Sequence, residues 1–244
     1  PGGVIRPRLP PSPKTLQIAL VLYDGMTALD AIGPYEVRRT IPDADLRFVS
    51  NTPGPVVTDS GVLVLGATHS FAETPAPDLF LIPGSTADTT TAMADRALIE
   101  WVQSAHQSST LTLSVCTGAL VLAAAGILKG RPATTHWAAQ SVLKGFGVDA
   151  RRDERIVRSG KIITAAGVSA GIDLALDVVM ELCGQAHDEV TQLAIEYDPQ
   201  PPLDAGHPSK ASPEIYRTAK REAFVAARNP RDVVSVPKIL WRQA

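Results

Sequence analysis

The chain has 244 residues, 45% of them hydrophobic, and a formal net charge of −2 at pH 7. This length is enough for one sizeable core, and the weak net charge argues against nucleic acid or an anionic membrane as a bulk partner. The longest apolar runs, such as residues 119–128, are shorter than the ~20 residues that a membrane-spanning helix needs. We therefore expect one domain with short extensions and no membrane span.

Strand and helix patterns alternate along the sequence. Short apolar runs and turn signals predict strands at residues 16–23, 46–50, 78–84 and 110–115, and hairpins at 56–65 and 155–164. Helical spacing is found at residues 29–39, 95–107, 117–126, 137–145, 170–182, 187–197 and 213–228. We expect Gly33-Pro34 to interrupt the start of the first helix. The alternation predicts an α/β fold in which a mostly parallel sheet lies between helical layers.

Three regions differ in composition. Residues 1–14 are rich in Pro and Gly and lack the apolar core of a secretion signal, so we expect a flexible segment. Residues 15–200 hold the alternating pattern and form the domain. Residues 201–244 are locally basic, and we expect this C-terminal extension to pack on the domain or on a dimer partner, with its charges on a solvated face. A nucleic-acid-binding patch is the alternative for the extension.

The chain has two cysteines, Cys116 and Cys183, whose spacing resembles no metal site and fits a reducing cytoplasm. Cys116 ends a predicted strand and precedes a predicted helix. Such a turn places the thiol at the carboxyl edge of the sheet, where ligands bind in open α/β folds. Nearby helical N–H groups are expected to lower the thiol pKa. A buried structural cysteine fits the same spacing. Cys183 lies late in a predicted apolar helix, so a packing role suits it better than a reactive one.

Further candidate residues lie at the same sheet edge. Asp30 follows the first strand by a short loop, as either a reactive carboxylate or the cap of the next helix. The backbone N–H groups of Gly84 and Ser85 follow another strand and form either an anion-binding nest or an ordinary turn. His136 is either a dyad partner of Cys116 or a polar capping residue. Sequence spacing leaves each of these alternatives open.

Three motifs carry a family resemblance: Ser-Val-Cys-Thr-Gly at residues 114–118, Ala-Thr-Thr-His-Trp at 133–137 and Gly-Val-Ser-Ala-Gly-Ile-Asp at 167–173. Together they resemble the ThiJ/PfpI superfamily, which has the class I glutamine-amidotransferase-like fold. Leu-Asp-Ala-Ile-Gly-Pro at 29–34 and Gln-Leu-Ala-Ile-Glu-Tyr-Asp-Pro-Gln-Pro-Pro at 192–202 resemble, more narrowly, the isonitrile (isocyanide) hydratase branch.

The resemblance implies a flavodoxin-like αβα sandwich, a homodimer, a small-molecule substrate and no metal or organic cofactor. It implies that Cys116 is the nucleophile, that Asp30 is the general acid/base, and that Thr117 places the carboxylate and the ligand. Four positions are the candidates for binding the substrate or its oxyanion: Gly84, Ser85, His136 and Val168. Three more are candidate pocket walls: Ile32, Trp137 and Ile172.

The implied chemistry suits these residue types. The Cys116 thiolate attacks the isocyanide carbon while protonated Asp30 donates to the developing nitrogen anion, which gives a thioimidate. The Asp30 carboxylate then activates water, and collapse of the adduct expels Cys116 and gives an N-substituted formamide. Asp30 needs a raised pKa to donate near neutral pH, and desolvation in an apolar pocket supplies it.

The sequence departs from the branch at Ser85, where a second glycine is usual, so that a side chain narrows the anion pocket or adds a hydroxyl. Ala165 and Ala166 also stand where glycines are common. The same domain occurs as the sensor half of AraC-type transcriptional regulators, whose DNA-binding module is expected to need more residues than the extension offers. A redox-protective role would use the same cysteine. Ligand sensing and redox protection are therefore the alternatives to hydration.

Overall fold

The fold is built around a seven-stranded sheet. The computed structural model describes residues 15–228, so the segment at 1–14, predicted to be flexible, and residues 229–244 of the extension lie outside the described residues. The strand order is β10-β11-β7-β6-β1-β2-β5, and β10 runs antiparallel to a sheet that is otherwise parallel. These strands are β1 (Leu16–Val21), β2 (Ala44–Ser50), β5 (His69–Ser70), β6 (Leu79–Ile82), β7 (Leu111–Val115), β10 (Ile156–Ser159) and β11 (Ile162–Ala165).

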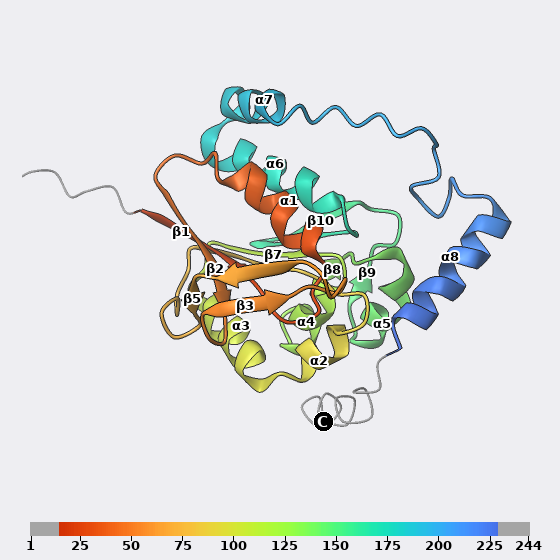
Figure 1. The fold of residues 1–244 in the computed structure, drawn as a ribbon, viewed down its shortest axis with the longest axis horizontal. Coiled ribbons are helices and arrows are strands. Elements are labelled where there is room, and N and C mark those ends of the chain that lie inside the picture. The colour runs from red at the N-terminus through yellow and green to blue at the C-terminus, as the bar shows by residue number, and fades with distance from the viewer. Residues whose placement is uncertain (1–14, 229–244) are drawn as a thin grey trace, which may run out of the picture.

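Helices cover both faces of the sheet (Figure 1), which confirms the predicted flavodoxin-like sandwich. One face carries α1 (Ala28–Arg38), α6 (Ala170–Cys183) and α7 (Gln185–Ala194). The other carries α2 (Thr89–Ala94), α3 (Arg96–Ser108), α4 (Gly118–Ala124), the 3-10 turn η1 (Trp137–Ala139) and α5 (Gln140–Gly145). No helix within residues 15–228 is both long and apolar enough to cross a bilayer.

Smaller elements lie outside the sandwich. The strands β3 (Gly54–Val57) and β4 (Val64–Ala67) form an antiparallel hairpin, as predicted, and β8 (Pro132–Ala133) pairs in parallel with β9 (Asp149–Ala150). The last described helix, α8 (Pro213–Ala226), follows α7 after a long extended segment that crosses to the far end of the molecule (Figure 1). The extension therefore places a helix near α5 and η1.

The core fills both faces of the central strands. Every residue of β6 and β7 is buried, as expected for apolar parallel strands that are covered on both sides. Leu98, Ile99 and Val102 of α3 enter the core on one face. The Asp95 side chain accepts hydrogen bonds from the first N–H groups of this helix and caps it. The apolar stripe and the cap together explain why α3 forms where the sequence predicts it.

The short strands β5, β8 and β9 were not predicted, and two helices also differ from the sequence predictions. The expected interruption at Gly33-Pro34 is wrong, because α1 runs without a break through both residues. Gly33 brings α1 close to α6: a Cβ there would lie 3.0 Å from Ile172 Cγ1. Packing between the helices therefore outweighs the local cost of the proline. The sequence patterns also miss α2, because its run of three threonines has a low helix propensity.

Gly118 begins α4 where this helix passes closest to the end of β6. A Cβ at this position would collide with the backbone carbonyl of Ile82 and lie 2.9 Å from that of Pro83. We expect Gly118→Ala to lower the free energy of unfolding, measured in urea, by about 1–3 kcal/mol, as overpacked sites do. Gly145→Ala in α5 is the control, because its Cβ would meet open space. Equal stability of the two variants would contradict this packing.

Candidate active site

Cys116 lies at a sharp turn between β7 and α4. Its backbone φ is +58°, a left-handed conformation that costs a residue other than glycine ~1–3 kcal/mol. The Cys116 N–H donates to the carbonyls of Ala165 and Ala166, both at 3.1 Å, and its carbonyl accepts from Thr135 Oγ1 at 2.8 Å. These hydrogen bonds hold the strained residue in place. The predicted strand-to-helix turn is therefore confirmed.

Asp30 approaches this turn from the first turn of α1. Its side chain is fully buried, and Oδ2 accepts from the backbone N–H of Gly84 at 2.8 Å. The side chain does not cap α1, whose N-cap residue is Thr27, so the capping alternative is wrong. The ends of β6 and β7 and the start of α1 thus bring Gly84, Cys116 and Asp30 together at the carboxyl edge of the sheet.

Burial controls the charge of both reactive groups. It raises the pKa of Asp30 to about 7, although the Gly84 N–H and the Cys116 thiol act as donors that lower it. Burial, and next the Asp30 charge, raise the pKa of Cys116 well above its usual value. The predicted lowering of the thiol pKa is therefore wrong, because hydrogen bonding from Thr117 does not replace the lost hydration.

The Thr117 hydroxyl fixes the loop that holds Asp30. Its Oγ1 donates to Ser85 O at 3.0 Å, accepts from Ser85 N at 2.9 Å and lies 2.7 Å from Thr89 Oγ1. Because Gly84 N–H is bonded to Asp30 and Ser85 N–H to Thr117, both amides already have protein acceptors. This turn therefore organises the reactive residues and does not present an open anion nest.

The Ser85 side chain turns away from the reactive groups. Its hydroxyl donates to Gly25 O at 2.5 Å and accepts from Asp88 N at 2.8 Å. Both contacts lie in the loops that precede α1 and α2. The residue that departs from the branch thus ties two loops together, and its hydroxyl is already engaged by the backbone.

His136 lies near Cys116 without bonding to it. A Cβ on Gly167 would contact both the His136 ring and Cys116 Sγ, the latter at 3.2 Å. The His136 Nδ1 accepts from Ala138 N at 3.4 Å and caps η1, and burial lowers the pKa of the ring. No hydrogen bond joins His136 to Cys116 in the part of the chain described, so the geometry agrees with the capping alternative.

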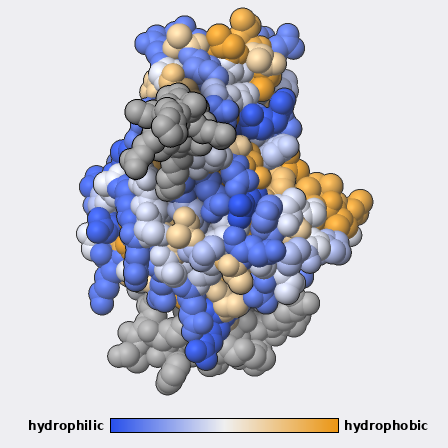
Figure 2. Space-filling model, turned by 90° about the vertical axis from the view of Figure 1, so that its left-hand side faces the viewer, coloured by the Kyte–Doolittle hydropathy of each residue, from blue (hydrophilic) through white to orange (hydrophobic). Residues whose placement is uncertain are grey.

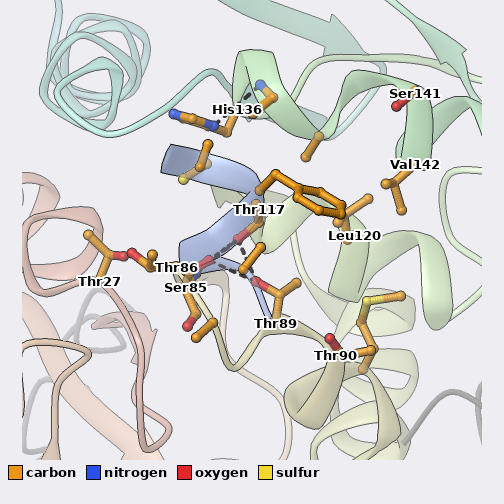
Figure 3. A pocket seen from close by; sticks show the side chains of 18 of the residues that line it. Thr27, Ser85, Thr86, Thr89, Thr90, Thr117, Leu120, His136, Ser141 and Val142 are labelled. Carbon is orange, nitrogen blue, oxygen red and sulfur yellow. Dashed lines mark hydrogen bonds between the residues drawn. The ribbon is translucent and has the colours of Figure 1, made fainter. Parts of the chain in front are cut away.

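A cavity of about 720 Å³ opens over the Cys116 thiol. In Figure 3 the side chains of Thr89 and Thr117 lie at one part of the cavity, and the apolar side chains of Leu120 and Val142 lie at another. Asp30 has no exposed surface, so a ligand in this cavity meets the Cys116 sulfur first. The cavity therefore combines a polar, reactive region with an apolar one.

The predicted lining is found in part. Three of the four candidate binding residues line the cavity: Ser85, His136 and Val168. Gly84 does not, because it lies behind the surface with Asp30. Three candidate walls are wrong: Ile32, Trp137 and Ile172. Ile172, for example, packs against α1 instead. Within residues 15–228, no three His, Cys, Asp or Glu side chains converge as metal ligands do.

The sequence patterns gave no signal for the roles of Tyr23 and Thr89 at the site, and they predicted the helix at 213–228 but not its position at the cavity. The Tyr23 hydroxyl donates to Pro83 O at 2.9 Å, and burial followed by the Asp30 charge raises its pKa and keeps it neutral. Thr89 belongs to a helix that the sequence patterns did not show. The helix α8 supplies cavity residues about a hundred positions after Cys116, and no local pattern reports such a contact.

Comparison with known proteins decides the family. The DJ-1/PfpI family matches residues 16–181, which include Asp30 and Cys116. The chain belongs to the DJ-1/PfpI family. This DJ-1/PfpI chain is 38% identical over 208 residues to the isonitrile hydratase of Pseudomonas putida. The aligned region covers 85% of this chain and 90% of that enzyme.

A solved structure and a transcriptional regulator are also similar to the DJ-1/PfpI chain. A crystal structure of a ThiJ/PfpI family protein from Pseudomonas syringae superposes with a TM-score of 0.80 at 34% identity, covering 87% of this chain and 90% of that one. The HTH-type transcriptional regulator CdhR of Pseudomonas aeruginosa is 35% identical over 105 residues, 43% of this chain and 30% of the regulator. The family predicted from the motifs is thus confirmed.

The raised pKa of Asp30 predicts how stability depends on pH. The folded state holds a proton up to about pH 7 that the unfolded chain releases near pH 4. The contribution of Asp30 to the free energy of unfolding is therefore fully present below pH 4 and is lost as the pH rises to 7. Asp30→Asn cannot titrate, so we expect its free energy of unfolding relative to the parent to rise by about 4 kcal/mol between pH 4 and 8.

Urea unfolding of the parent and of Asp30→Asn at both pH values measures this difference, since other titrating groups are common to the two proteins. A difference that is independent of pH would contradict a buried carboxyl group with a raised pKa.

Proposed function

We propose that the protein hydrates isocyanides to N-substituted formamides, with Cys116 as the nucleophile and Asp30 as the general acid/base. The observation that carries the proposal is a buried carboxyl group with a pKa of about 7 beside a thiol that lines an apolar cavity. The similarity to isonitrile hydratase over most of both chains supports the same reaction.

In the first step, Asp30 acts as a base. The raised thiol pKa means that the proton stays on sulfur until an acceptor takes it. Asp30 Oδ1 has no hydrogen bond of ordinary geometry within the described residues, so it can accept this proton. The carboxylate removes the Cys116 proton as sulfur bonds to the isocyanide carbon. Protonated Asp30 then donates this proton to the same carbon.

This step adds sulfur and hydrogen to one carbon: R–N≡C becomes R–N=CH–S–Cys116. The proton therefore ends on carbon and not on nitrogen, where the sequence-based scheme placed it, because a thioimidate carries a C–H bond. Asp30 leaves the step as a carboxylate, ready for the second half of the reaction.

In the second step, the Asp30 carboxylate removes a proton from water, and the oxygen of this water bonds to the thioimidate carbon. One of the two water protons goes to the nitrogen. The C–S bond breaks, and the Cys116 sulfur takes the second proton. The product is R–NH–CHO, and the enzyme returns to its starting state. Because Asp30 alternates between base and acid, a pKa near the working pH suits both roles.

Formamide production from an aryl isocyanide tests the function. We expect the parent to convert it, Cys116→Ala to lose at least a thousandfold in rate, and Asp30→Asn to lose about 10²–10⁴-fold, as removal of a general acid/base does. Cys183→Ala is the matched control and retains the parent rate, because Cys183 lies at the end of α6, outside the cavity lining.

Mass spectrometry of stopped reactions would show the thioimidate as an adduct on the peptide that holds Cys116. No turnover by the parent would end the hydratase proposal, whereas turnover that survives in Cys116→Ala would end the mechanism alone.

We also propose that the protein forms a homodimer through the β3–β4 hairpin. Apolar side chains at and beside its tip are exposed: Val57, Val62, Leu63 and Val64. Val62 is 87% exposed. In Figure 2 apolar side chains gather on a projection at the right-hand edge, the side on which this hairpin lies. Contiguous apolar surface of this kind is typical of protein interfaces.

Sedimentation equilibrium tests this interface. We expect the parent to have twice the mass of one chain and Val62→Lys to shift at least tenfold toward monomer, because the lysine charge would be desolvated at the contact. Leu193→Lys, at a 77% exposed position on α7, is the control and leaves the dimer intact. A monomeric parent, or equal dissociation of both variants, would contradict the hairpin interface.

Ligand sensing is the second candidate, because the chain matches part of a transcriptional regulator. A sensor would bind the isocyanide without converting it. Calorimetric binding by the parent with no formamide produced would therefore favour sensing over hydration.

A further inference from the structure

The helix α8 covers the cavity although it lies far along the chain from Cys116. Four residues in or just beyond its C-terminal half line the cavity: Lys220, Ala223, Phe224 and Ala227. Positions three and four apart share one face of a helix, so these residues form one stripe that faces the cavity. In Figure 3 the violet-blue ribbon of α8 passes between His136 and Thr117.

The helix is held mainly at its other end. The Tyr216 ring lies 5.6 Å from that of Trp137, and its hydroxyl accepts from Arg152 Nη2 at 3.5 Å. No residue of α8 is buried. A helix of 14 residues is marginal by itself. The α8 stripe therefore has little support of its own where it faces the cavity.

Phe224 is the large apolar side chain of this stripe, and 62% of it is exposed. Large apolar side chains from other elements also line the cavity, among them Met93, Leu120, Val142 and Phe146. An apolar group that fills this region would take Phe224 out of water and pack against both walls. Burial of this kind is favourable by roughly 25 cal/mol for each Å². The lining of the cavity thus suits an apolar group.

We propose that the α8 stripe, through Phe224, is the outer wall of the substrate site and selects isocyanides with a bulky apolar organic group. The proposal rests on the hydratase function and adds the substrate class to it. A cavity of about 720 Å³ is within the range of ~300–1,000 Å³ typical of drug-sized ligands. Methyl isocyanide fills little of it and leaves Phe224 exposed. We expect a naphthyl group to reach the stripe while its isocyanide carbon lies at Cys116, because both line the same cavity.

Substrate preference tests the proposal. The quantity measured is the ratio of kcat/KM for 1-naphthyl isocyanide to that for methyl isocyanide. We expect Phe224→Ala to lower this ratio about tenfold, as loss of an apolar contact in a pocket does. Phe224→Leu, which keeps an apolar side chain, restores most of it. Val225→Ala is the matched control, because Val225 is 59% exposed on the same helix but does not line the cavity.

Binding of N-(1-naphthyl)formamide, measured by calorimetry, separates this proposal from the hydratase function. We expect Phe224→Ala to raise its Kd about tenfold and Val225→Ala to leave it unchanged, whether or not the parent hydrates isocyanides. Equal Kd values and equal ratios for the two alanine variants would overturn the proposal. A parent that binds this amide in the expected way but produces no formamide would overturn the reaction and leave the apolar wall standing.

Discussion

A carboxyl group and a thiol share one water-poor site beneath the end of β7, and burial raises the pKa of both. The rest of the site keeps this pair together. Gly84 N–H binds the Asp30 carboxylate, the Thr117 hydroxyl fixes the same loop, and the left-handed backbone of Cys116 turns the thiol toward the cavity. The energetic cost of burying Asp30 is the physical reason that it can exchange protons near neutral pH.

The raised thiol pKa changes the chemistry that the sequence suggested. A thiolate formed in advance needs no base, but a thiol does. In the proposed mechanism Asp30 therefore first removes the thiol proton and then donates it, so that one residue serves as base and acid in both steps. Cys116 itself faces the cavity, whereas Asp30 lies behind it. A ligand in the cavity therefore contacts the Cys116 sulfur before it can reach the Asp30 carboxyl group.

The sequence predicts most of the sheet because short apolar runs end at clear turns, and parallel strands bring those turns together. That is why Cys116 and Asp30 could be proposed as neighbours from spacing and family motifs. The direction of the thiol pKa could not, because it depends on how much water the finished fold excludes. The same holds for Gly33-Pro34, where packing on α6 decides the outcome, and for Phe224, which reaches the cavity through a long connection with no local signal.

The alkylation rate of Cys116 against pH measures directly whether the buried thiol keeps its proton beside Asp30. A Cys183→Ser background leaves one cysteine to react, and iodoacetamide reports its thiolate. We expect a thiol pKa well above the usual value, which falls in Asp30→Asn because the neighbouring negative charge is lost. A thiolate already formed below pH 7, or a thiol pKa that Asp30→Asn leaves unchanged, would contradict this expectation.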